Sequence, residues 1–102
     1  SKRAFYPGLQ AGAVVVENEA EVDAALAELR NSMDDSVVAI DLEWRPDLTG
    51  PSRNPVALIQ LATSSLCVLL RTCRMGNKLP DSLKTFLADG SVTLVGFAWD
   101  SA

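Results

Sequence analysis

One segment, Val37–Trp44, constrains the fold of this 102-residue chain more than any other. Its residues favour a β-strand, in which side chains two positions apart project from the same face. On that parity one face of the segment is wholly apolar, while the other begins with valine and alanine and ends in Asp41 and Glu43. The pattern predicts a central strand that is buried on both sides and whose far end opens into a site.

The segments that follow predict a mixed α/β sheet. Residues 56–63 and 66–71 are apolar runs separated by two serines, so with residues 37–44 they should form a three-strand antiparallel meander. A short helix is expected with Pro80 at its first position and Gly90 as its terminator, and then a strand at residues 92–98. Because a helical crossover joins parallel strands, we expect this last strand to lie beside residues 37–44.

The first third of the chain predicts one helix. Residues 1–12 are interpreted as a polar lead-in, and residues 13–16 as a short β-branched run. Apolar side chains then recur at i, i+3, i+4 and i+7, so residues 19–31 should form an amphipathic helix, capped by a box of Asn18 and Glu21.

Composition excludes several classes of protein. No apolar run approaches the ~20 residues that a bilayer span needs, and the first residues lack the apolar core of a secretory signal, so an intracellular protein, nuclear or cytoplasmic, is expected. The chain has no histidine, so Cys67 and Cys73 cannot complete a four-ligand zinc site and are interpreted as buried or idle thiols. Gln60 is interpreted as a hydrogen-bonded core amide.

The net charge of −4 argues at first sight against a nucleic-acid substrate, because proteins that bind phosphates usually present a basic face. The charge is uneven, however. Nine acids against three bases give −6 in residues 1–44, and six bases against four acids give +2 in residues 45–102. Five of the acids fall on or beside the predicted helix, so their positions matter more than their total.

Three acids are candidates for a metal site. Asp100 follows the strand at residues 92–98, and parallel neighbours end at the same edge of a sheet, where α/β proteins bind their ligands. Asp41, Glu43 and Asp100 would then face one another. Oxygen ligands without histidine or cysteine select Mg²⁺ or Mn²⁺, and a bound cation would relieve the repulsion between the carboxylates.

The residues that carry this pattern resemble the 3'-5' exonuclease domains of the DEDD superfamily, especially the Werner-syndrome and ribonuclease D branch. The motifs D-x-E-W, V-A-L-I-Q-L and V-G-x-x-x-D occur in order at residues 41–44, 56–61 and 95–100. The likeness runs from about Ala13 to the last residue. It implies an RNase H-like fold and a two-metal hydrolysis of phosphodiester bonds at the 3' end of DNA or RNA.

The resemblance also implies roles for individual residues. Asp41 would bridge both metal ions, and Glu43 would bind one ion and orient the terminal nucleotide. Asp100 would hold the second ion or its water. Leu42 and Trp44 occupy the positions where the family packs a terminal base, although core packing is favoured for Leu42.

The chain departs from the family in one respect. Members carry a further motif, a Tyr or His with a final metal-binding Asp, downstream of the point where this sequence stops, and the only tyrosine here is Tyr6. We therefore expect residues 13–102 to be the N-terminal portion of an exonuclease domain, with a truncated fold. An inactive exonuclease-like module that binds nucleic acid or protein, or associates with itself through an exposed sheet edge, is the main alternative. A purely structural α/β module is a third.

Overall fold

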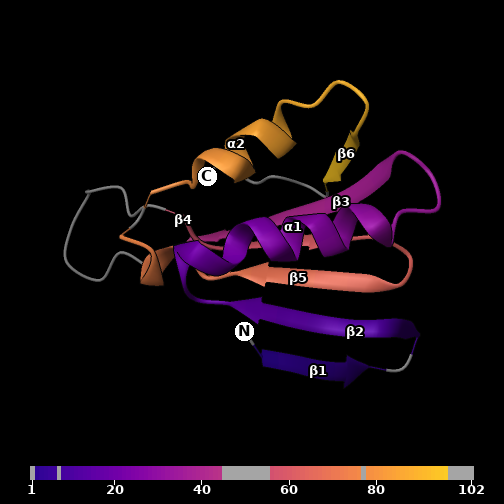
Figure 1. Ribbon diagram of the computed structural model, residues 1–102, viewed down its shortest axis with the longest axis horizontal. Coiled ribbons are helices and arrows are strands. Elements are labelled where there is room, and N and C mark those ends of the chain that lie inside the picture. Colours follow the sequence, from indigo (N-terminus) through magenta and orange to yellow (C-terminus); the bar gives the residue numbers. More distant parts are fainter. Residues whose placement is uncertain (1, 7, 45–55, 77, 97–102) are drawn as a thin grey trace.

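The computed structural model describes the chain in four ranges, residues 2–6, 8–44, 56–76 and 78–96. In these ranges two α-helices lie on one face of a six-stranded sheet with the strand order β1-β2-β5-β4-β3-β6 (Figure 1). The strands are β1 (Lys2–Tyr6), β2 (Leu9–Val16), β3 (Val37–Trp44), β4 (Val56–Ala62), β5 (Leu66–Leu70) and β6 (Thr93–Gly96). The helices are α1 (Val22–Asn31) and α2 (Asp81–Leu87), and 3₁₀ turns occur at Glu19–Glu21 and Thr72–Arg74. None of the helices in these ranges has the length and apolar character to cross a membrane.

The predicted meander and crossover are confirmed. Strands β3, β4 and β5 pair in succession, each antiparallel to the one before. Strand β6 lies parallel to β3 on its other side, with Val37 beside Thr93 and Ile40 beside Gly96. The described part of the last strand therefore runs in the same direction as β3. Residues 97 and 98 of the predicted strand lie outside the described residues.

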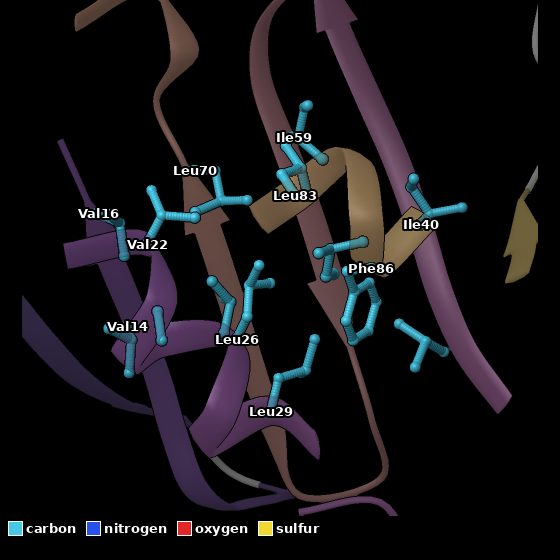
Figure 2. Packing of buried hydrophobic residues seen from close by; sticks show 14 of the residues in the cluster. Val14, Val16, Val22, Leu26, Leu29, Ile40, Ile59, Leu70, Leu83 and Phe86 are labelled. Atoms are coloured by element: carbon cyan, nitrogen blue, oxygen red, sulfur yellow. The ribbon is translucent and has the colours of Figure 1, made fainter. Parts of the chain in front are cut away.

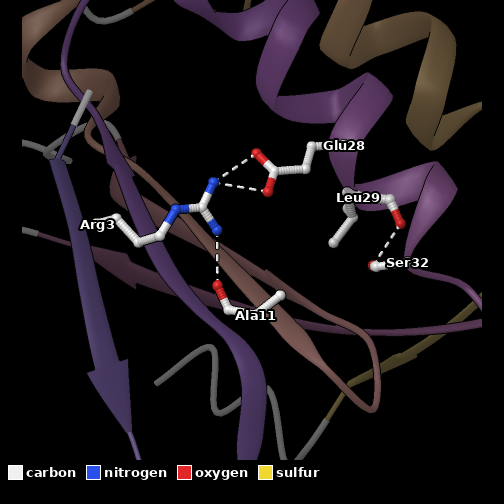
Figure 3. A network of polar contacts seen from close by, with 5 residues as sticks. All are labelled: Arg3, Ala11, Glu28, Leu29 and Ser32. Atoms are coloured by element: carbon white, nitrogen blue, oxygen red, sulfur yellow. Dashed lines mark hydrogen bonds and ion pairs between the residues drawn. The ribbon is translucent and has the colours of Figure 1, made fainter.

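The interpretation of residues 1–12 as a lead-in is wrong, because most of them form strands of the sheet. Strand β1 pairs antiparallel with β2, and β2 extends the sheet by a parallel pairing with β5. Arg3 fastens β1 to the helix layer: its guanidinium donates to both carboxylate oxygens of Glu28, at 2.8 and 2.6 Å, and to the carbonyl of Ala11 at 2.6 Å (Figure 3). Polar and charged side chains are common on an edge strand, which explains why this one does not show the alternation of a half-buried strand.

Gly12 permits the close approach of β1 to β2. Its φ of +79° lies in the left-handed region, and a Cβ at this position would collide with the backbone carbonyl oxygen of Ala4. The pairing of β1 with β2 shifts register between Ala4 and Tyr6, at the same place along the ladder. A glycine at position 12 is thus a steric condition for this end of the sheet.

The hydrophobic core lies between the sheet and both helices (Figure 2). Val38 and Ile40 of β3 point into it, as do Leu29 of α1 and Phe86 of α2, and the exposed fraction of each side chain is 7% or less. The predicted parity of β3 is therefore confirmed on its apolar face. Its other face was expected to be buried near the start of the strand, but Val37 is 41% exposed. Both described helices lie on the core face, so no described helix covers the other side.

Helix α1 begins later than predicted. Its buried residues are those of the expected apolar stripe. Residues 19–21, however, form a 3₁₀ turn, because the side chain of Asn18 accepts a hydrogen bond from the backbone N–H of Ala20 at 2.9 Å. Glu21 donates its backbone N–H to the Asn18 carbonyl at 3.0 Å. Asn18 therefore caps the 3₁₀ turn rather than the α-helix.

Helix α2 is shorter than predicted. Pro80 has a ψ of 148°, so it is extended and precedes the helix instead of occupying the first helical position. Its carbonyl accepts the backbone N–H of Lys84 at 3.1 Å. The helix ends at Leu87, three residues before Gly90.

Candidate active site

Asp41 and Glu43 lie near the carboxyl end of β3, on the face of the sheet that points away from the helices. Both residues are exposed, whereas Ile40, which precedes Asp41 in the strand, is on the opposite face and points into the core. The pairing with β4 places Asp41 opposite Gln60 and Glu43 opposite Leu58. No described residue forms an ion pair with either carboxylate. Because both residues are exposed, a ligand that approaches from solvent can reach this face of β3.

Gln60 belongs to this acidic face and not to the core. It is half-buried, while its neighbours Ile59 and Leu61 are buried on the opposite face. The interpretation of Gln60 as a core amide is therefore wrong, because the parity of β4 turns its side chain to the side of Asp41. Its amide is the polar neighbour of the acids on the adjacent strand.

The third predicted acid, Asp100, lies outside the described residues. The parallel pairing of β3 with β6 is described as far as Ile40 beside Gly96, one residue before Asp41. Within the described ranges no three His, Cys, Asp or Glu side chains come together as a metal site. The convergence of Asp100 with the other two acids stays a prediction.

The two predicted substrate-binding residues differ in what the structure says about them. Leu42 is half-buried and packs against the core cluster, on the face opposite to Asp41 and Glu43. This is the core packing that the sequence favours for it. Trp44 ends β3 and pairs with Val56 through its backbone, but its side chain lies outside what the structure describes.

A groove of about 520 Å³ is lined by Glu43 and by residues at the ends of the two neighbouring strands. The other described residues that line it are Ala57, Leu58, Arg71, Cys73 and Arg74. The arginines were not among the predicted site residues. The positive balance of residues 45–102 is a weak signal for them, but it does not indicate that the end of β5 and the following 3₁₀ turn line the same groove as Glu43.

On the basic side of the groove, both arginines interact with the carboxylate of Glu17. Arg71 donates from Nη1 to Oε2 of Glu17 at 2.6 Å, and the Nε of Arg74 lies 3.8 Å from the same oxygen. The side chains of Arg71 and Arg74 are 41% and 62% exposed. An exposed ion pair of this kind contributes little to stability, about 0–1 kcal/mol, so these guanidiniums remain open to exchange their partner.

Both cysteines are free and half-buried. Cys67 lies in β5 on the same face as the acids, and burial raises the pKa of its thiol. Cys73 lines the groove beside the arginines. A thiol with a raised pKa is a poor nucleophile at neutral pH, which agrees with the interpretation of Cys67 as idle.

Comparison with known proteins identifies the family. A model of the 3'-5' exonuclease family matches residues 13–101, which include both acids of β3. The chain belongs to the 3'-5' exonuclease family. The resemblance to the DEDD exonucleases is therefore confirmed. A human relative, exonuclease 3'-5' domain-containing protein 2, is 41% identical over 93 residues, and the Drosophila melanogaster protein of the same name is 43% identical over 75.

The matched segment is a small part of these relatives. It covers 86% of this chain and 15% of the human protein, and 72% of this chain and 12% of the Drosophila protein. Among solved structures, the EXD2 exonuclease domain superposes with a TM-score of 0.69 at 40% identity, over 84% of this chain and 45% of that one. The Aedes aegypti Nibbler EXO domain gives 0.65 at 25% identity, over 93% and 43%. These neighbours confirm the predicted RNase H-like fold.

Proposed function

We propose that this chain contributes to a metal-dependent 3'-5' exonuclease that hydrolyses nucleic-acid phosphodiester bonds by a two-metal mechanism. The observation that carries the proposal is the pair of exposed carboxylates, Asp41 and Glu43, on one face of β3 within the segment matched to the family. Adjacent same-face residues of a strand are ~7 Å apart at Cα, so two flexible carboxylates can reach one cation between them.

The donor set suits a hard cation. Asp41 and Glu43 offer only oxygen atoms, and no described base neutralises them. Crystals of the related EXD2 domain were soaked in Mg with GMP and in Mn, at 39% and 40% identity to this chain, which supports a divalent ion here. When bound, two such ions would supply the stabilisation of the attacking and the leaving oxygen in an in-line displacement.

The chain's own residues have three expected roles in this mechanism. Asp41 would bridge both ions from the middle of the face. Glu43, at the mouth of the groove, would hold one ion and orient the terminal nucleotide of the DNA or RNA strand. Asp100 would hold the second ion or its water. Trp44, with Leu42, is proposed to support the terminal base.

The test is removal of one charge at a time. Asp41→Asn and Glu43→Gln should each weaken Mn²⁺ binding, measured by calorimetry, and lower the rate of 3'-end degradation by at least a hundredfold, because each removes a metal ligand. Asp23→Asn, at an exposed position of α1, is the matched control and should leave both unchanged. If Asp41→Asn left nuclease activity unaltered in a chain that carries the whole exonuclease domain, the assignment of Asp41 as a metal ligand would be refuted.

A second candidate function is an inactive module that binds nucleic acid or protein. It is favoured by the apolar side chains at the β6 edge of the sheet, where Val37, Leu94 and Val95 are 41%, 36% and 42% exposed. This candidate predicts no turnover at any Mg²⁺ or Mn²⁺ concentration, together with a complex or oligomer in size-exclusion chromatography with light scattering. Turnover by this chain would exclude it.

A further inference from the structure

The groove at Glu43 combines an acidic wall and a basic wall. Glu43 comes from the end of β3, and the two arginines come from the other side, where β5 ends and the 3₁₀ turn Thr72–Arg74 follows. Strand β4 lies between β3 and β5 in the sheet. Neighbouring strands are ~4.8 Å apart, so the two walls are separated by ~10 Å. This is the scale of one or two repeats of a nucleic-acid backbone.

The basic wall has the chemistry of a phosphate site. A guanidinium presents five N–H donors in a planar fork that matches two oxygens of a phosphate. In Arg71 one of these nitrogens, Nη1, donates to Glu17, and Arg74 is held at 3.8 Å by the same carboxylate oxygen. Among the described residues, one carboxylate thus balances two guanidiniums that line a groove open to solvent.

The direction of the groove agrees with such a site. A nucleotide whose 3' end lies at Asp41 and Glu43 has its preceding phosphates on one side, and the same groove is lined by Glu43, by Ala57 and Leu58 of β4, and by the two arginines. The half-buried Leu58 and Ala57 belong to β4, which lies between β3 and β5, and carry no charge. A strand that follows the groove would therefore meet positive charge one or two phosphates away from the acids.

We propose that Arg71 and Arg74 bind the phosphodiester backbone of a single-stranded nucleic acid next to its 3' end, and that Glu17 competes with the phosphate for both guanidiniums. The inference rests on the proposed function, which supplies the ligand class. It adds to that function a phosphate subsite built from β5 and the following turn, and a carboxylate that lowers its affinity.

The test measures the binding of a single-stranded oligonucleotide of about 12 nucleotides that carries a 5'-fluorescein label. Fluorescence anisotropy is the readout, and EDTA is present so that no metal ion contributes. Arg71→Gln and Arg74→Gln should each weaken binding by about threefold or more. Each should also reduce the slope of log affinity against log salt by about 0.7 between about 50 and 200 mM salt. Lys84→Gln changes the net charge equally at an exposed position of α2 that does not line the groove, and should do neither.

Glu17→Gln separates this proposal from a purely structural ion pair. If Glu17 only fastens Arg71 in place, its loss should weaken binding as Arg71→Gln does. If it competes with phosphate, Glu17→Gln should strengthen binding by about threefold. Weaker binding by Glu17→Gln, or arginine variants that bind like Lys84→Gln, would overturn the proposal.

Two further measurements identify the ligand and distinguish a failure of the phosphate subsite from a failure of the proposed nuclease function. Inorganic phosphate at the concentration of the oligonucleotide phosphates should compete weakly, and equal competition would overturn a backbone site in favour of a simple anion site. The nuclease function is tested separately by Asp41→Asn with Mn²⁺ present, which should abolish 3'-end degradation because it removes a metal ligand. If the arginine variants bind the oligonucleotide like the unaltered chain while Asp41→Asn abolishes metal-dependent degradation, the phosphate subsite is refuted. The proposed nuclease function then stands.

Discussion

The attachment of β1 to the sheet depends on two separate properties of Gly12, its left-handed backbone and the absence of a Cβ beside Ala4. Three alanine substitutions separate them. Gly90 has neither property, since nothing lies within 4 Å of the position that a Cβ would take and its φ is not positive. Gly8 has a φ of +88° with open space around it. Gly12 combines a φ of +79° with the collision against the carbonyl oxygen of Ala4.

The magnitudes follow from these differences. Gly90→Ala should be neutral or stabilising by a few tenths of a kcal/mol, because it reduces the entropy of the unfolded chain. Gly8→Ala should cost about 1 kcal/mol for the left-handed conformation. Gly12→Ala should cost about 2–3 kcal/mol, because the strain is added to the displacement of a ladder carbonyl and the loss of its hydrogen bond. For a small domain that is a large share of a total of about 5–15 kcal/mol.

The assay is urea unfolding of the three variants with hydrogen exchange of the β1 amides as a local readout. The expected order of destabilisation is Gly12→Ala, then Gly8→Ala, then Gly90→Ala, and Gly12→Ala alone should speed exchange in β1. If Gly12→Ala and Gly8→Ala lose the same free energy, the collision with Ala4 contributes nothing. The close pairing of β1 with β2 would then be refuted.

Two further predictions concern titratable groups. Hydrogen bonds from the side chain and backbone N–H of Ser91, with Arg30 nearby, lower the pKa of Asp89 from its ordinary value of 3.8 to about 2. A lowered pKa stabilises the fold above pH 4 and loses that effect as the pH falls toward 2, so Asp89→Asn should flatten the acid limb of a stability–pH curve measured by urea unfolding. A limb of unchanged steepness would contradict this. Because burial raises the pKa of Cys67, its thiol should react with a disulfide reagent more slowly than that of Cys73 at pH 8, as peptide mapping of the labelled chain would show.

Much of the fold follows from local patterns. The parity of β3 predicts which side chains enter the core, and Val38 and Ile40 are buried while Asp41 and Glu43 are exposed. The parallel placement of β6 follows from the helix that precedes it, because a crossover connection has few alternatives. These features depend on residues close in sequence, which a pattern can represent.

What sequence reasoning missed depends on contacts between distant segments. Strand β1 does not show the alternation of a half-buried strand, and only its pairing with β2 and the reach of Arg3 to Glu28 show that it belongs to the sheet. The position of Gln60 beside Asp41 requires the register of β4 against β3, which no local pattern specifies. The basic wall was missed for the same reason, since Arg71 and Glu17 are 54 positions apart.

The placement of the carboxylates has a consequence for metal affinity. At 4 Å the attraction between two unit charges is about 1 kcal/mol in bulk water and about 4 kcal/mol at a protein surface of lower effective dielectric constant. Asp41 and Glu43 are exposed, so two carboxylates in this setting can hold a divalent ion only weakly. A useful affinity therefore requires further oxygen ligands, for which Asp100 is the candidate, or substrate phosphates. If substrate oxygens complete the coordination, metal and nucleic acid must strengthen each other's binding, because a coupling free energy is reciprocal. The exposed acids and the basic groove beside them would then act as one site, in which the cation and the phosphate backbone are recognised together.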